Sequence, residues 1–434
     1  MPGPGVELIG EEEIAEVMQV LTSRALSRYG SADDPAFGAK VRTVEQEIAS
    51  IAGVRYGLGL HGGGSSGLFV TLLGIGVGPG DEVIVPGFTF VASISAIVYA
   101  RGTPVLAEVD DSFNLDPADV EARITPRTKA ILVVHMLGAP ARLDELKDIA
   151  DRHGIALIED CAQAFGATYQ GQGVGGIGAA GIYSFNEYKT ITCGDGGMIV
   201  TDDEDLYRRF FAIHDQGHAP NRLGSKYAER PFLGLNFRMT ELSGAVLLAQ
   251  VRKLDLIRDH LRANKAIVKS TIADLPGLGF RTIVDPEGDL ATHLVVTFPS
   301  ADIAKAVADE LGSITLASSG WHVYANMEHL LNQRTASGRG CPFDCACYPS
   351  EAGAYRSGML PQTDALLARS MSIGIGVSDA NLAPFGLRMR DDEAAARGVA
   401  ERGTGGVLPG RRLERDQGPL GPGVGRTAGG RHHR

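Results

Sequence analysis

The sequence is poor in cysteine, has no long apolar run and carries no excess of positive charge. Five cysteines in 434 residues do not make a disulfide framework and are typical of reduced cytosolic thiols. The longest apolar runs, such as residues 130–134, have the length of a strand and fall far short of the ~20 residues that span a bilayer. The formal net charge of -11 argues against non-specific nucleic-acid binding, which needs a basic surface.

A signal peptide is also missing from the start of the sequence. The chain opens with MPGPGVELIG and then turns acidic, where a signal peptide needs a basic region followed by an apolar one. The remaining composition, 44% hydrophobic and 21% charged, is that of a soluble globular enzyme. We therefore expect a cytoplasmic protein that binds neither membranes nor nucleic acid.

Short apolar stretches alternate with helical ones over much of the chain. Helical periodicity begins at residues 10–29 and 40–52. Strands are then expected at 55–60, 82–85, 104–109, 130–134, 156–159, 181–185 and 198–201, and helices at 66–73, 91–100, 117–123 and 144–153. This alternation predicts an α/β fold in which helices cover both faces of a large, mostly parallel sheet.

The second half of the chain predicts a smaller unit. Two helices, at about 241–254 and 260–273, lead out of the large unit, and a strand at 294–298, a helix at 301–311 and a strand at 371–375 follow. We predict a large domain over 1–255 and a small C-terminal α/β domain over 256–391. Residues 392–434 are rich in glycine and arginine and lack aliphatic periodicity, so this tail is expected to be disordered.

Open parallel sheets bind ligands beyond the C-terminal ends of their strands, and a glycine-rich segment is expected there first. This segment, 61–67 (HGGGSSG), joins a strand to a helix. Its glycines allow an anion to approach the backbone, and the helix N-terminus, Ser65 and Ser66 supply donors. An ordinary glycine-rich turn is the alternative. A nucleotide triphosphate loop is disfavoured because no lysine follows as in GxxxxGK[ST].

Two further segments at the same edge carry a carboxylate and an amine. Asp160 follows an apolar strand, where a carboxylate is commonly a cap or solvated, although one held against a pyridinium nitrogen keeps that nitrogen protonated. Ser184 ends another strand, where its hydroxyl can meet a phosphate oxygen. Lys189 follows a few residues later. A lysine is by default a surface charge, but a crowded site keeps an amine partly neutral and able to attack a carbonyl.

Together with 83–93 (VIVPGFTFVAS), these segments resemble the DegT/StrS family of sugar aminotransferases within the fold-type I pyridoxal-phosphate (PLP) enzymes. The resemblance runs from about residue 48 to 379 and is closest over 64–249. It implies pyridoxal 5'-phosphate as the cofactor and Lys189 as its Schiff-base lysine. It also implies Asp160 as the partner of the ring nitrogen, Gln163 beside the ring and Phe90 stacked on the ring face.

The resemblance assigns the phosphate end of the cofactor as well. Gly64, Ser65, Ser66 and Ser184 are implied to hold the phosphate; the family commonly has Gly-Thr-Ala at the loop, and serine keeps the hydroxyl. Asn236, in GLNFRMTEL, is implied to reach the phosphate of the neighbouring subunit in a homodimer with composite active sites. The helix after Asn236 has too many apolar residues for one narrow stripe, so we expect it to be buried on more than one side: Leu242, Val246, Leu247, Leu248 and Val251.

The implied activity is the transfer of an amino group from glutamate or glutamine to a keto-sugar or keto-cyclitol, in amino-sugar or natural-product biosynthesis. Lys189 would act as general base and then as general acid. Two alternatives stay open: a PLP-dependent sugar dehydratase, whose members carry His at the lysine position, and a non-catalytic PLP-binding regulator. Residues 321–331 and 359–370 resemble members that act on ketosugars without a nucleotide.

Other patterns are interpreted as structural. Two overlapping GxGxxG matches over 171–178 lack the strand-to-helix context of a dinucleotide loop and are read as a flexible connection. His135 is interpreted as a strand-end histidine. Cysteines and histidines near residue 341 lack paired C-x2-C spacing, so no metal site is predicted: Cys341, Cys345, Cys347, His322 and His329. A substrate-facing lid is expected from Trp321, His322, Tyr324 and Tyr348.

Overall fold

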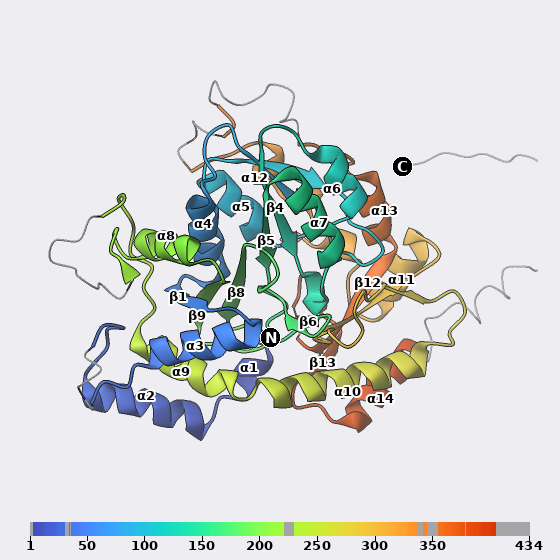
Figure 1. Ribbon diagram of the computed structural model, residues 1–434. Coiled ribbons are helices and arrows are strands. Elements are labelled where there is room, and N and C mark those ends of the chain that lie inside the picture. The colour runs from blue at the N-terminus through green and yellow to red at the C-terminus, as the bar shows by residue number, and fades with distance from the viewer. Residues whose placement is uncertain are drawn as a thin grey trace, which may run out of the picture.

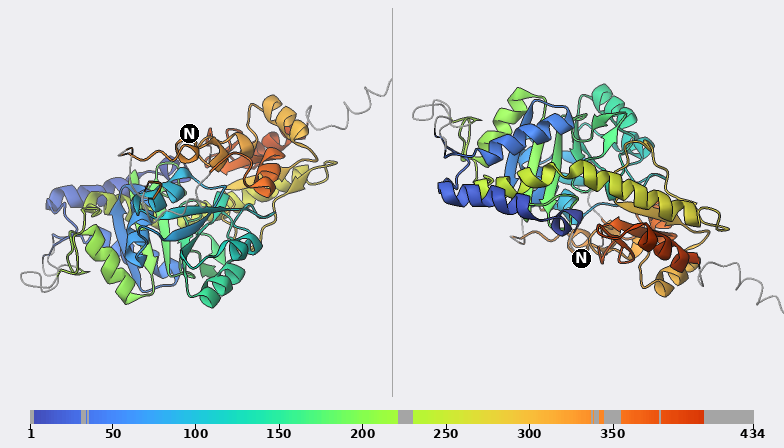
Figure 2. Two further views of the ribbon diagram at one scale, coloured as in Figure 1. Left: turned by 90° about the horizontal axis from the view of Figure 1, so that it is seen from above. Right: turned by 90° about the horizontal axis from the view of Figure 1, so that it is seen from below.

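The structure, a computed structural model, describes residues 3–30, 34, 36–220, 230–336, 338, 342–344, 355–377 and 379–404. Its main body is a seven-stranded sheet with helices on both sides, next to a smaller sheet (Figures 1 and 2). Within the described residues, every helix is too short or too polar to form a membrane span.

The large sheet has the strand order β1-β9-β8-β5-β4-β2-β3. Its strands are β1 (Tyr56–His61), β2 (Glu82–Pro86), β3 (Thr103–Ala107), β4 (Thr128–Val134), β5 (Ala156–Asp160), β8 (Ala180–Asn186) and β9 (Asp195–Thr201). Strand β9 is antiparallel to both of its neighbours, and the other pairs are parallel. The prediction of a mostly parallel sheet is confirmed, with strand ends within three residues of those expected.

Alternation along the strands explains why helices are needed on both faces. On β4, Ile131 and Val133 join a core cluster with α3 and α7, whereas Leu132 and Val134 join a second cluster with α4 and α5. Successive side chains of a strand point to opposite faces, so a fully apolar strand must be covered twice. The helices of this unit are α3 (Lys40–Ala52), α4 (Gly63–Ile75), α5 (Val91–Tyr99), α6 (Pro117–Arg123), α7 (Leu143–His153) and α8 (Glu204–His214).

The smaller sheet has the order β10-β11-β12-β13, antiparallel except for the parallel pair β12–β13. Its strands are β10 (Gly279–Phe280), β11 (His293–Thr297), β12 (Ser370–Gly376) and β13 (Gly386–Arg388). The helices that contact it include α10 (Leu254–Ile272), α11 (Ala301–Glu310) and α13 (Pro361–Ala368). Helix α12 (Glu328–Leu331) lies beside α5 instead, and β6 (Thr168–Tyr169) pairs with β7 (Gln172–Gly173) elsewhere. The domain limits at residues 255 and 391 stay predictions.

The N-terminal helices differ from the prediction. In place of one helix over 10–29, the chain forms α1 (Pro4–Glu7) and α2 (Glu11–Ser23), because Arg24 adopts a left-handed conformation with φ of 60° that ends the helix. Helix α9 (Glu241–Val251) packs between α2 and α3, as Figure 1 shows. The apolar side chains around α9 are therefore largely covered by helices of the same chain.

Residues 393–404 correct the prediction of a disordered tail from residue 392. They form α14 (Glu393–Thr404), which packs against α10. Ala396, Val399 and Ala400 are buried there in the main core cluster. This stripe of small side chains at positions i, i+3 and i+4 is narrow, so it buries apolar surface without the long aliphatic pattern that the prediction required. Residues 405–434 lie outside the described residues.

Candidate active site

A cavity of about 520 Å³ opens where the parallel strands of the large sheet end. Strand β5 contributes Asp160, β8 contributes Ser184, and β11 and the segment after β12 close the cavity from the side of the smaller sheet. The cavity brings together most of the residues predicted from sequence: Gly64, Ser65, Phe90, Asp160, Gln163, Ser184 and Lys189. Ser66 and Asn236 do not line it.

The N-terminus of α4 forms one end of the cavity. Gly62 and Gly63 have φ of 84° and 68°, a left-handed backbone that favours glycine, and they turn the chain from β1 into the helix. The first N–H groups of a helix have no partner within it, so they are available to an anion beside Ser65. The hydroxyl of Ser66 instead donates to the carbonyl oxygens of His61 (2.6 Å) and Gly63 (3.0 Å). Ser66, the residue after Ser65 in α4, therefore points away from the cavity and into the turn between β1 and α4.

Two neighbouring carboxylates at the end of β5 point to opposite faces of the sheet. Asp160 lies on the face of Ile158 and α4, and Glu159 lies on the face of Leu157. The Asp160 carboxylate accepts from the Ser93 hydroxyl (2.8 Å) and from the Ala162 N–H (3.0 Å). Burial raises the pKa of Asp160, although these hydrogen bonds oppose the change. A cation placed at this carboxylate would lower its pKa again.

Glu159 organises the glycine-rich segment that matched GxGxxG. Its carboxylate accepts from the N–H groups of Gly175 (2.7 Å), Ile177 (2.8 Å) and Gly178 (2.6 Å). It also contacts His135 Nε2 at 3.2 Å, while His135 Nδ1 accepts from the Ala141 N–H. The segment is thus a tightly held connection around a buried carboxylate and not a flexible one, and His135 is a structural histidine.

His135, Glu159 and Cys161 each offer one possible metal-ligand atom, and these atoms lie within 4.8 Å of one another. Both Glu159 oxygens already accept hydrogen bonds, and burial raises the pKa of the Cys161 thiol well above its usual value. A metal ion needs a free carboxylate and a thiolate, so this cluster is a hydrogen-bonded structural group.

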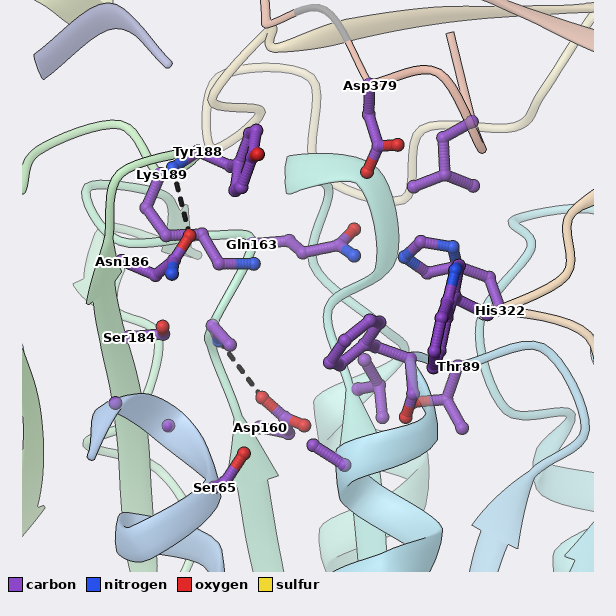
Figure 3. A pocket seen from close by; sticks show the side chains of 18 of the residues that line it. Ser65, Thr89, Asp160, Gln163, Ser184, Asn186, Tyr188, Lys189, His322 and Asp379 are labelled. Carbon is purple, nitrogen blue, oxygen red and sulfur yellow. Dashed lines mark hydrogen bonds between the residues drawn. The ribbon is translucent and has the colours of Figure 1, made fainter. Parts of the chain in front are cut away.

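Lys189 follows β8 on the wall of the cavity that also carries Asn186 and Ser184 (Figure 3). The Lys189 N–H donates to the Asn186 carbonyl (3.0 Å), and the N–H of Gly3 donates to the Glu187 carbonyl (2.8 Å), so the N-terminus holds this loop from behind. Burial lowers the pKa of the Lys189 amine, and the carboxylates of Asp160 and Asp379 partly offset the shift. A lowered pKa increases the fraction of neutral, nucleophilic amine.

Aromatic and amide groups shape the middle of the cavity. Phe90 is 41% exposed and its ring lies 5.2 Å from that of His322, which also lines the cavity, as does Trp321. Gln163 Oε1 accepts from the Leu137 N–H (2.8 Å), which leaves the amide NH₂ as a donor. Tyr324 corrects the predicted lid, because it is fully buried and its hydroxyl donates to Asp364.

Several predicted positions of that region lie outside the described residues: Tyr348, Cys341, Cys345 and Cys347. The sequence reasoning, in turn, missed cavity residues at the start of β11 and in the segment after β12 of the smaller sheet. Thr292, His293 and Asp379 line the cavity, and no spacing relative to the motifs of the large sheet marks them.

Asn236 lies outside the cavity of its own chain. Its side chain is exposed, and its Oδ1 accepts from the Arg238 N–H (3.2 Å). The backbone carbonyl of Asn236 contacts His61 Nε2 at 2.9 Å. Leu233 and Leu235, on the same segment, are exposed as well.

A large, mostly parallel sheet, a helix N-terminus, a buried carboxylate and a lysine around one cavity, closed by a smaller sheet, give the chain the fold of the fold-type I aminotransferases. The model of the DegT/DnrJ/EryC1/StrS aminotransferase family matches residues 7–316. The chain belongs to this family.

The sequence is similar to that of a named synthase and that of a named aminotransferase. GDP-perosamine synthase from Caulobacter vibrioides is 42% identical over 238 residues, which are 55% of this chain and 62% of that protein. L-glutamine:2-deoxy-scyllo-inosose aminotransferase from Streptoalloteichus tenebrarius is 38% identical over 265 residues, 57% of this chain and 62% of that protein. The match thus spans less than two thirds of the length of these two relatives. The structure of S. venezuelae DesV is 30% identical, with a TM-score of 0.69 over 90% of this chain and 94% of that one.

Proposed function

We propose that the protein is a PLP-dependent aminotransferase that transfers an amino group from glutamate or glutamine to a keto-sugar or keto-cyclitol. The observation that carries the proposal is the placement of Lys189 and Asp160 in one cavity with the N-terminus of α4. The donor set fits each part of the cofactor. The helix end with Ser65 and Ser184 suits the phosphate, Asp160 suits the ring nitrogen, and Lys189 suits the aldehyde.

When bound, PLP supplies an aldehyde that takes up the amino group and a ring that delocalises an electron pair. Neutral Nζ of Lys189 removes the proton from the α-carbon of the amino-acid donor and returns a proton to the carbon that receives the amino group. The negative charge of Asp160 holds a proton on the ring nitrogen. Phe90 and Gln163 line the same cavity and would hold the ring, Phe90 by its aromatic face and Gln163 by its amide.

The alternatives receive less support. A sugar dehydratase of this family carries His in place of Lys189, and both named relatives are named for synthase or aminotransferase activity. A non-catalytic regulator would also hold the cofactor on Lys189, so turnover is the property that separates it from an aminotransferase. The proposal includes a homodimer in which Asn236 serves the phosphate of the partner's site, since Asn236 is exposed and does not line its own cavity. A cytoplasmic location stays a prediction.

Replacing the lysine tests the proposal. Lys189→Ala should remove the visible absorbance of the lysine-bound cofactor and abolish keto-acid formation from glutamate or glutamine, because among the residues that the structure describes Lys189 is the only lysine that lines the cavity. Lys129→Ala, an exposed lysine of β4 outside the cavity, is the matched control and should keep both signals. Turnover by Lys189→Ala would refute the assignment. A wild-type protein that shows the absorbance but no turnover with any ketone would favour the regulator.

A further inference from the structure

The carboxylate of Asp160 accepts a hydrogen bond on each of its two oxygens. The backbone N–H of Ala162 donates to Oδ1 (3.0 Å), and the hydroxyl of Ser93 donates to Oδ2 (2.8 Å). Ser93 belongs to the first turn of α5, 67 residues away in the chain, and it is fully buried. A serine in a helix commonly bonds to the backbone of its own helix, whereas Ser93 gives its proton to a carboxylate of a neighbouring strand.

A second hydroxyl group continues this contact. Thr89 Oγ1 lies 2.8 Å from Ser93 Oγ, and the side chain of Thr89 is fully buried as well. In the charged state that pairs with a ring cation, Asp160 only accepts, so Ser93 donates its single proton there. The oxygen of Ser93 must then accept the proton of Thr89. The two residues therefore form a hydroxyl chain that runs from Thr89 through Ser93 to Asp160.

The turn between β2 and α5 carries this hydroxyl chain together with Phe90. The N–H of Thr89 donates to the carbonyl of His322 (2.9 Å), and the N–H of Val91 donates to the carbonyl of Trp321 (2.9 Å). Both Phe90 and Thr89 line the cavity, and Figure 3 shows Thr89 in the lower part of the view, as it does Asp160. One turn, fixed by backbone hydrogen bonds, thus positions an aromatic ring and the support of a carboxylate.

Hydrogen bonds to a carboxylate favour its charged form. Burial raises the pKa of Asp160, and the hydrogen bonds from Ala162 and Ser93 oppose this change. The titratable groups that act on Asp160 or lie beside it are Lys189 after β8, His135 after β4, and Glu159 and Cys161 at the end of β5. Ser93 is uncharged and contacts the carboxylate directly. A change at Ser93 therefore alters the charge balance of Asp160 and leaves these groups in place.

We propose that Ser93 and Thr89 are positioning residues of the active site, whose hydroxyl chain keeps Asp160 oriented and charged as the partner of the cofactor's ring nitrogen. Asp160 holds a proton on that nitrogen only while the carboxylate is the weaker base of the two. Loss of a donor makes the carboxylate a stronger base, and the shared proton then moves toward it. This inference rests on the proposed aminotransferase function, because the ring nitrogen belongs to PLP.

The protonation of the ring is measured without turnover, from the nitrogen NMR signal of isotope-labelled PLP in the holoenzyme. In Ser93→Ala this signal should move toward that of an unprotonated pyridine. The pH midpoint of the visible band of the lysine-bound cofactor should rise by about one unit, the effect of one lost charge-assisted hydrogen bond. The midpoint rises because a ring with less positive charge withdraws less electron density from the nitrogen of Lys189, which then holds its proton more strongly.

Further variants separate the hydroxyl chain from a packing defect. Thr89→Val keeps the shape and removes the hydroxyl, so it should move the midpoint in the same direction but by less, because Thr89 acts only through Ser93. Thr89→Ser keeps the hydroxyl and should titrate as the wild type does. The matched control is Ser95→Ala, a half-buried serine of the same helix outside this cavity, which should keep both signals. In Ser93→Ala, Thr89 still has the carbonyl of Phe90 as an acceptor at 3.4 Å.

Activity is a second readout. Ser93→Ala should lower kcat about tenfold and change KM for glutamine little, because the charged ring matters most in the transition state. An unchanged nitrogen signal and an unchanged midpoint in Ser93→Ala overturn the inference even if activity falls, since a merely structural defect does not move the proton. A wild-type signal of an unprotonated ring overturns it too. A shift in Ser93→Ala without one in Thr89→Val overturns the role of Thr89.

The wild-type holoenzyme separates this inference from the proposed function. If neither glutamine nor glutamate changes the absorbance of its cofactor, the aminotransferase function fails. If either donor reacts while Ser93→Ala keeps the nitrogen signal and the midpoint of the wild type, the function stands and the inference fails.

Discussion

Complementation between two inactive variants gives the sharpest test of how the active site is built. Asn236 is exposed, lies outside its own cavity, and shares its segment with the fully exposed Leu233 and with Leu235. A second copy related by a two-fold axis would cover these leucines and bring Asn236 to its site. The two perturbations are Lys189→Ala, which removes the amine, and Asn236→Asp, which places a carboxylate against the phosphate.

The expected magnitude follows from counting sites. Each variant alone forms inactive homodimers. Random exchange of equal amounts makes about half of the dimers hybrids, and in a composite arrangement one of the two sites of each hybrid has both residues intact. About a quarter of all sites, and about a quarter of the wild-type specific activity, should therefore return. If Asn236 served its own subunit, every site would keep one defect and no activity would return.

The assay is keto-acid formation from glutamine after mixing differently tagged variants, with the hybrid fraction measured by sequential affinity capture. The matched control mixes wild type with the double variant Lys189→Ala/Asn236→Asp. Composite sites predict about a quarter of the wild-type activity in this control, and sites within one chain predict about half. No recovery in the first mixture together with half activity in the second, with hybrids present in both, would refute the composite site.

The remaining predictions concern the ring nitrogen, the C-terminal helix and acid stability. Asp160→Asn should still bind PLP, seen by absorbance, but lose about 10²–10³-fold in kcat because the amide cannot stabilise the charged ring; near-parental turnover would make Asp160 merely structural. Val399→Asp should lower the free energy of unfolding in urea by about 3 kcal/mol because it buries a carboxylate between α14 and α10. Ala394→Asp, exposed in the first turn of the same helix, should change it by less than about 0.5 kcal/mol, and equal effects would contradict the packing of α14. Burial raises the pKa of Glu159, but hydrogen bonds from His135 and from backbone N–H groups outweigh it and lower the pKa below its usual 4.5. Its charge therefore stabilises the fold above pH 4.5, and this contribution is lost as the pH falls through the folded value. Glu159→Gln should thus cost about 2–3 kcal/mol at pH 7, with a difference from the parent that narrows below pH 4.5, and a constant difference would contradict this account.

Local patterns predicted the elements whose signals are local. The helix expected over 40–52 has these bounds in α3, because its apolar periodicity ends at Gly53, which takes the left-handed conformation of a helix end. The helix expected over 10–29 was too long, since nothing in the apolar pattern marks the left-handed Arg24. The tail prediction failed over α14 because a narrow stripe of three residues, Ala396, Val399 and Ala400, is enough to pack the helix against α10.

The site residues also divide into those that sequence patterns predict and those that only the tertiary structure places. The sequence by itself determined the groups of the large sheet, such as Asp160, Ser184 and Lys189, because each follows a strand and parallel strands end at one edge. Only the tertiary structure decided that Ser66 turns into the strand–helix turn and that Asn236 lies outside its own cavity. The tertiary structure alone also placed His293 and Asp379 on the wall of this cavity. The packing of one sheet against another depends on contacts between residues far apart in the chain, and these contacts leave no spacing pattern in the sequence.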